Sequence, residues 1–371
     1  MSLHAGMAQS WQPLTARDMR RWLSASLPPK RGPQQLAGAR RNIAVALAMT
    51  TWPAAGRAYR RAATPQTVPL VELNRSCATA PSRQAGDQAA GSPLLDAFQN
   101  VGAFQVQVPG PLVVQSRGVF QEFELFMESP EKEKRRLLCD PEELLHVHGY
   151  QPRGSQGERF NRYRSGLVLH GRQTLPLLPE QFQAQLASWR EQVWRLAERI
   201  LHQLVCELHE TGMMEVQPSM GLFSEGASLD MISGSHFQLK KMHPADDVPL
   251  AGSAGKETVR LPLHQDPSFL SLLIHGSSAP PGQGLEVWHE ASQEFVAVPR
   301  SGCEVATILI GQLFHLLCGR GDLRFAKGAH RVVTRPEDMQ RQRLGAVFFF
   351  QPKLDTLLLP LVPPTKGDDV P

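Results

Sequence analysis

The sequence lacks the long apolar run that a membrane-spanning helix needs. Hydrophobic residues make up 42% of its 371 residues. No uninterrupted apolar stretch reaches the roughly 18 to 20 residues that cross a bilayer, so we expect no transmembrane span. The hydrophobic fraction is ordinary for a globular protein and is sufficient for a sizeable core. The length fits one large domain or two small ones.

Cysteine is scarce and dispersed. An odd number of scattered thiols, with no C-x-x-C pair, indicates free cysteines in a reducing compartment rather than a disulfide framework. The same spacing argues against a structural zinc site held by cysteines. We therefore expect an intracellular protein, and the five cysteines are Cys77, Cys139, Cys206, Cys303 and Cys318.

Acidic residues are nearly absent from the start of the chain. Residues 1–62 hold ten lysines and arginines and one acid, Asp18, a net charge of +9; the whole chain carries +4, so the remainder carries −5. A basic, acid-poor stretch rich in Arg, Ala and Ser is typical of a mitochondrial or plastid transit peptide. An RNA-binding or membrane-surface segment, or a basic tail without structure, has the same composition. We expect residues 1–65 to be a leader and linker. The expected location is a mitochondrion or plastid, or otherwise the cytoplasm. We expect no nucleic-acid partner for the remainder of the chain.

The next part of the chain is expected to mix strands and helices. Residues 68–73 suit an edge strand, because Pro69 cannot donate to a ladder. Ser92 and Pro93 have the residue types of an N-cap and a first helical position. Residues 102–108 alternate with period two, which indicates a strand, and a single helix is expected over about 112–138.

The clearest helix signal begins near Pro179 and ends at Gly212. Its apolar residues recur at steps of three or four, which predicts one stripe that packs on a core. The residues of the stripe are Phe182, Leu186, Trp189, Val193, Leu196, Ile200, Leu204 and Leu208.

From Phe237 onward the pattern changes to short apolar runs broken by Gly, Pro and Ser. Such spacing is typical of a β-sandwich or jelly roll. Helices followed by strands predict an α+β protein with an all-β catalytic core. We expect an N-terminal region over residues 66–215, the core over 216–360 and a tail over 361–371. The runs are 259–263, 269–274, 285–288, 305–310 and 344–350.

His264 and Asp266 follow one of these runs and are two residues apart. On a strand, residues two apart face the same side with Cα atoms about 6 to 7 Å apart, so both side chains could ligate one metal ion. An isolated H-x-D is equally well a polar pair at a strand end. Two histidines and one carboxylate on one face of an ion are the arrangement of non-haem Fe(II) oxygenases. The candidates for the second histidine are His275, His289, His315 and His330.

The order of motifs resembles the isopenicillin N synthase-like branch of the Fe(II)/2-oxoglutarate-dependent dioxygenases. The family pattern H-x-D-x-x-x-L-T-L-L is similar to residues 264–273, and its Gly-Leu-x-Val strand to Gly284-Leu285-Glu286-Val287. Its H-R-V and its arginine before a Phe-rich strand correspond to His330-Arg331-Val332 and to Arg343 ahead of Phe348-Phe349-Phe350. With weaker upstream matches, the resemblance covers about residues 66–360.

This resemblance implies a double-stranded β-helix, or jelly roll, with flanking helices. It implies an oxidoreductase whose Fe(II) is held by His264, Asp266 and His330, with Arg343 pairing with the far carboxylate of 2-oxoglutarate. A planar guanidinium suits that role because it binds a carboxylate through two hydrogen bonds. O2 and a small organic substrate, most commonly hydroxylated, are the expected partners, with ascorbate as an optional reductant. The sequence does not indicate the substrate or the oligomeric state.

Three positions depart from the family pattern. Gly345 replaces a serine that would also hold the carboxylate, Lys241 or Met242 replaces a tyrosine, and Gln312 replaces an aspartate. Lys241 could supply a compensating cation or could simply be solvated. These changes leave the metal ligands intact but affect the cosubstrate pocket. The alternative is therefore a catalytically degenerate binding or regulatory protein that kept the fold.

Overall fold

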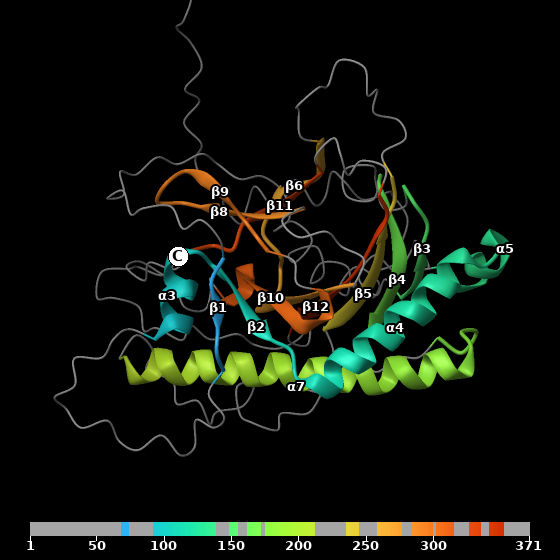
Figure 1. The fold of residues 1–371 in the computed structure, drawn as a ribbon, viewed down its shortest axis with the longest axis horizontal. Coiled ribbons are helices and arrows are strands. Elements are labelled where there is room, and N and C mark those ends of the chain that lie inside the picture. The colour runs from blue at the N-terminus through green and yellow to red at the C-terminus, as the bar shows by residue number, and fades with distance from the viewer. Residues whose placement is uncertain are drawn as a thin grey trace, which may run out of the picture. The chain divides into compact units, whose positions relative to one another are not determined.

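Two β-sheets and a layer of helices organise the part of the chain that the computed structural model describes (Figure 1). This mixed architecture confirms the expected α+β class. The described residues all belong to a unit formed by residues 48–371. They are 68–73, 92–138, 148–154, 162–171, 175–211, 235–244, 258–276, 284–299, 302–314, 326–334 and 341–351.

The leader over residues 1–65 and the tail over 361–371 lie outside the described residues. The transit peptide and the domain boundaries therefore stay predictions. Among the described helices, none is both long and apolar enough to span a membrane.

The larger sheet has eight strands, four from before residue 215 and four from after it. Neighbouring strands are antiparallel, except that β1 runs parallel to β2. The expected edge strand is confirmed, because β1 lies at one end of this sheet. In spatial order the strands are β1 (Leu70–Val71), β2 (Ala103–Gln107), β10 (Val305–Ile310), β7 (Leu270–His275), β12 (Arg343–Phe350), β5 (His236–Met242), β4 (Arg164–His170) and β3 (Gly149–Gln151).

The smaller sheet has four antiparallel strands that all come from the second half of the chain. Together the two sheets contain each short apolar run that the sequence predicts as a strand. In spatial order they are β6 (Thr258–His264), β11 (His330–Thr334), β8 (Leu285–His289) and β9 (Glu294–Ala297).

Two of the described helices begin where the sequence predicts. Helix α3 (Pro93–Asn100) is capped by the Ser92 side chain, which accepts from the backbone N–H of Leu95. The long helix α7 (Glu180–Glu210) is confirmed, and Figure 1 shows it running along the larger sheet beside α4. The short 3-10 segment η4 spans Gly302–Glu304.

The single helix expected over residues 112–138 is wrong. Helix α4 (Gly110–Glu128) ends before Pro130, and the chain continues as α5 (Glu131–Lys134) and the 3-10 turn η1 (Arg135–Leu137). Ser129 is extended, with φ −62° and ψ 158°. A residue before proline is pushed out of the helical region and the proline has no N–H to donate, which explains the break.

Each face of the larger sheet packs on a different hydrophobic core. Alternate residues of β12, such as Phe348 and Phe350, pack with the helices in the main core. Val347, one position earlier on the strand, packs with the second core, which includes Val287 and Val296 of the smaller sheet. Since successive side chains of a strand point to opposite faces, β12 supplies one face to the helices and the other to the space between the sheets.

Two tryptophans of α7 offer a matched test of the main core. Trp189 donates from Nε1 to Ser116 Oγ at 2.9 Å, whereas the buried Nε1 of Trp194 has no hydrogen-bond partner among the described residues. Both Trp→Phe changes remove ring volume, but only Trp189→Phe breaks a buried hydrogen bond. We expect Trp189→Phe to lower the free energy of unfolding by about 1 kcal/mol more than Trp194→Phe. Urea unfolding of the two variants measures this; equal losses would contradict it.

Candidate metal centre and its pocket

His264 and His330 are brought together by strand pairing. They are direct partners across the antiparallel β6–β11 ladder, and their ring centroids are 4.3 Å apart. The Asp266 carboxylate lies between them, with Oδ1 3.5 Å from His264 Nε2 and Oδ2 3.8 Å from His330 Nε2. One ligand atom from each of the three residues lies within 4.8 Å of the others. Among the described residues, this is the group that could hold a metal ion.

The sequence suggested that alternation along a strand places Asp266 beside His264, but the structure shows a different cause. Strand β6 ends at His264, and Asp266 lies in the turn that follows. The turn is fixed by backbone hydrogen bonds, including Gln312 N–H to the Asp266 carbonyl at 2.8 Å. The histidine and the carboxylate do lie side by side, but the segment after β6 brings them together rather than alternation along a strand.

Both histidines are oriented by backbone carbonyls. His264 Nδ1 lies 2.8 Å from the Pro262 carbonyl oxygen, and His330 Nδ1 lies 3.0 Å from that of Gly328. Because a carbonyl can only accept, each Nδ1 carries a proton, and each Nε2 is the ring nitrogen that faces Asp266. Such second contacts are typical of metal-ligating histidines. Two imidazole nitrogens and one carboxylate oxygen fit Fe(II).

The charge states of the group also suit a metal ion. Burial alone would raise the pKa of Asp266, but His330 and His264 outweigh it and hold that pKa well below its usual range. Burial, followed by the neighbouring His264, lowers the pKa of His330 to about 4. At neutral pH, Asp266 is therefore ionised and His330 neutral, which are the forms that bind metals.

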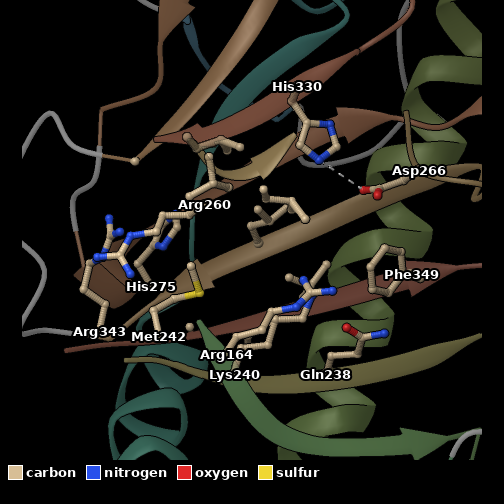
Figure 2. Close-up of a pocket in the computed structure, with 18 of the residues that line it drawn as sticks. Arg164, Gln238, Lys240, Met242, Arg260, Asp266, His275, His330, Arg343 and Phe349 are labelled. Atoms are coloured by element: carbon tan, nitrogen blue, oxygen red, sulfur yellow. Dashed lines mark ion pairs between the residues drawn. The ribbon is translucent and has the colours of Figure 1, made fainter. Parts of the chain in front are cut away.

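The triad opens into a cavity of about 350 Å³ that is lined by both sheets (Figure 2). Arg343 lies at the end away from Asp266 and His330, beside Met242 and His275. Its side chain is buried and Nη2 donates to Thr334 Oγ1 at 2.8 Å. Arg343 therefore lines the same cavity as the triad.

A second arginine is tied to the same hydroxyl. Arg260 Nε donates to Thr334 Oγ1 at 3.1 Å, and its guanidinium lies 4.5 Å from the Tyr163 ring centroid. Thr334 is fully buried, so it positions the two guanidinium groups without lining the cavity.

The lysine in the cavity is Lys240, not the neighbouring Lys241. Lys240 lines it, whereas Lys241 is buried outside its lining. Met242, not Lys241, is the register partner of Arg343. Neither possibility considered for Lys241 is therefore right: it is buried rather than solvated, and alternation turns it to the other face of β5, so that Lys240 is the lysine in the cavity.

His275 lies next to the position where the family has a serine. It is the register partner of Gly345, and a Cβ added to that glycine would lie 3.8 Å from His275 Nδ1. The imidazole is thus placed beside Arg343 at the far end of the cavity (Figure 2). The other candidate ligands differ: His289 hydrogen bonds with Ser292 at 2.8 Å outside the cavity lining, and His315 lies outside the described residues.

Sequence reasoning missed three cations of the cavity. Arg164, Lys240 and Arg260 all line it, on β4, β5 and β6. Arg260 stands four residues before His264, so period-two alternation could have placed both on one face. Strand β4 was not predicted, and nothing in the sequence pairs it with β5.

The fold is shared with solved dioxygenases, whereas no protein-family model and no curated protein sequence matches the chain. The dioxygenase for auxin oxidation 1 from Arabidopsis thaliana, in complex with 2-oxoglutarate, has a TM-score of 0.56 at 18% identity, over 79% of this chain and 96% of that one. The rice dioxygenase for auxin oxidation gives 0.54 at 19% identity, over 79% and 86%. A full-length Neurospora crassa protein, solved in complex with alpha-KG and thymine, gives 0.53 at 13% identity, over 79% and 88%. The chain therefore has the fold of these dioxygenases.

Proposed function

We propose that this protein is a non-haem Fe(II) oxidoreductase that couples oxidative decarboxylation of 2-oxoglutarate to oxidation of a small organic substrate. The observation that carries the proposal is the convergence of His264, Asp266 and His330, with both Nε2 atoms directed at the carboxylate, inside a cavity lined by arginine. Hydroxylation is the expected outcome.

The strand order supports a double-stranded β-helix as the core. From β5 to β12 the chain passes repeatedly between the larger and the smaller sheet: β5, β7, β10 and β12 belong to the first, and β6, β8, β9 and β11 to the second. A jelly roll winds two facing sheets in this manner. The candidate ligands lie on β6, β11 and the turn after β6, between the sheets.

In this proposal the triad holds Fe(II), which together with 2-oxoglutarate and O2 supplies the oxidising chemistry, with succinate and CO2 as co-products. The ligand set of two histidines and a carboxylate leaves positions on the ion open for these molecules. The carbonyl contacts of His264 and His330 place the proton of the neutral imidazole on Nδ1, so that Nε2 is the atom that would bind the ion. Apolar lining residues such as Leu273 and Val347 exclude water from the site.

Arg343 would hold the far carboxylate of 2-oxoglutarate, with its guanidinium fixed by Thr334. His275 lies where it could donate the hydrogen bond that the family serine gives and that Gly345 lacks. Arg260, held by the same Thr334 hydroxyl, adds positive charge nearby. These contacts offset the departures that favour a catalytically degenerate protein.

The test is whether the purified chain, supplied with Fe(II), ascorbate and O2, converts 2-oxoglutarate to succinate. A ligand that binds only the folded protein raises its melting temperature, so 2-oxoglutarate should also stabilise the protein, and only when Fe(II) or Mn(II) is present. Protein treated with a chelator is the control. If the protein shows no turnover and no metal-dependent stabilisation, the proposal is overturned and a degenerate binding or regulatory protein is favoured.

A further inference from the structure

Arg164 and Lys240 line the cavity with side chains that extend toward Asp266, whereas Arg343, which flanks the same Met242 from β12, extends toward the other end (Figure 2). Arg164 on β4 is the register partner of Met242 on β5, and Lys240 lies two residues from Met242 on the same face. Such diagonal neighbours are about 7 to 8 Å apart, within reach of long side chains. Figure 2 shows Arg164 and Lys240 together on the side of the cavity that faces Asp266.

These two cations are held together at an energetic cost. Burial, and then the charge of Arg164, lowers the pKa of Lys240, while Asp266 opposes this effect. Burial likewise lowers the pKa of Arg164 to about 10, and Asp266 again opposes this effect. Like charges placed together in a poorly solvated site disfavour one another unless an anion accompanies them.

The charge balance of the cavity leaves room for a second anion. Its lining contains one carboxylate, Asp266, and the basic side chains of three arginines and one lysine, which are Arg164, Arg260, Arg343 and Lys240. A divalent metal ion adds two positive charges. Since 2-oxoglutarate carries two negative charges, the loaded cavity still has an excess of positive charge.

The wall around this pair is partly apolar, with Gln238 as a polar neighbour on the same face of β5 (Figure 2). Lys240 Nζ lies 5.6 Å from the centroid of the Phe349 ring, and Phe349 stacks on His236. Leu261 and Val332 from the smaller sheet also line the cavity. Such a lining suits a hydrocarbon body that carries one charged group.

We propose that Arg164 and Lys240 bind a carboxylate of the substrate that is oxidised, so that the substrate is a small organic acid with an apolar body. This inference rests on the proposed function, because it assigns the Arg343 end to 2-oxoglutarate. Arg164 offers a two-pronged contact and Lys240 a point charge. The pair thereby selects an acid over an uncharged compound and directs its apolar part toward Phe349.

The experiment uses the full chain loaded with Mn(II), which does not turn over, and with 2-oxoglutarate. Calorimetric titration compares 3-phenylpropanoate with 3-phenylpropanamide, which has a similar shape and no charge. We expect the acid to bind about ten- to a hundredfold more tightly, the usual effect of hydrogen bonds to a charged group. Arg164→Gln and Lys240→Gln should each reduce this preference, while Lys240→Arg should keep it. Lys241→Gln, which changes a lysine outside the cavity lining, is the matched control and should behave as the unaltered protein.

Binding of 2-oxoglutarate separates the possible failures. If Arg164→Gln and Lys240→Gln weaken the binding of 2-oxoglutarate as strongly as Arg343→Gln does, the pair serves the cosubstrate. The inference is then overturned, while the proposed function stands. If 2-oxoglutarate shows no metal-dependent binding to the unaltered protein, the proposed function itself fails. Equal binding of acid and amide also overturns the inference.

A second measurement covers the case in which neither probe fits the cavity. Crystals of the Mn(II) and 2-oxoglutarate complex are soaked in sodium bromide, and anomalous density is sought between Arg164 and Lys240. Bromide at that place, absent from Lys240→Gln, supports an anion site beyond the cosubstrate. No bromide there overturns the inference.

Discussion

Replacing His330 by alanine should abolish metal binding and, with it, succinate formation. Loss of a contact that merely orients a metal ligand costs about 10- to 100-fold in affinity or activity, so loss of the ligand itself should cost at least about 100-fold. His330 is also the residue that strand pairing places opposite His264, and no other described histidine lies within reach of Asp266 as a replacement. Calorimetry with Mn(II) and a succinate assay with Fe(II) measure the two losses.

His289→Ala is the control for this change. His289 lies on the same sheet and is equally buried, but its imidazole hydrogen bonds with Ser292 outside the cavity lining. The control should keep metal affinity within about twofold, as expected for a change away from the site. Circular dichroism confirms that both variants are folded. A folded His330→Ala protein that binds Mn(II) as tightly as the unaltered chain would refute the assignment of this ligand.

Replacing Arg343 by glutamine should weaken 2-oxoglutarate binding by roughly 30-fold or more, because truncating one member of a buried charge pair costs about 2 to 5 kcal/mol. Metal affinity should be unchanged, since Arg343 lies at the opposite end of the cavity from Asp266 (Figure 2). Arg343→Lys should recover only part of the loss, because an ammonium lacks the two-pronged geometry. Titration of the Mn(II)-loaded variants with 2-oxoglutarate gives the dissociation constants.

Arg331→Gln provides the matched arginine control. Arg331 comes directly after His330, but its guanidinium pairs with Glu286 at 2.7 Å and lies 3.6 Å from the Phe295 ring centroid, outside the cavity lining. This variant should bind 2-oxoglutarate normally. If Arg343→Gln binds it normally as well, the cosubstrate carboxylate is held elsewhere, and the other cations of the cavity are the next candidates.

Local patterns in the sequence predicted helices and strands correctly where an element has one face toward solvent or toward a single core. The stripe of α7 and the cap at Ser92 predicted their helices, because helical spacing and end chemistry depend on nearby residues. The short apolar runs likewise predicted the strands of both sheets. The break after α4 follows from Pro130, whose effect on the helix outweighs the apolar periodicity that continues across it.

The cavity was less predictable, because the larger sheet is buried on both faces. On β5, alternation separates Lys240 from Lys241 but does not say which of them faces the helices and which the smaller sheet. That choice depends on partners distant in the chain, β4 and β12, whose register aligns Arg164 and Arg343 with Met242.

By itself, the sequence determined the types of side chain available: the histidines and aspartate that suit iron, and an arginine before a Phe-rich strand. Only the tertiary structure decided that His264 and His330 are cross-strand partners, that the turn after β6 places Asp266 between them, and that two further cations share their cavity. The physical reason is that ligand chemistry belongs to individual residues. Distances across a site are instead set by strand register and by turns between segments far apart in sequence.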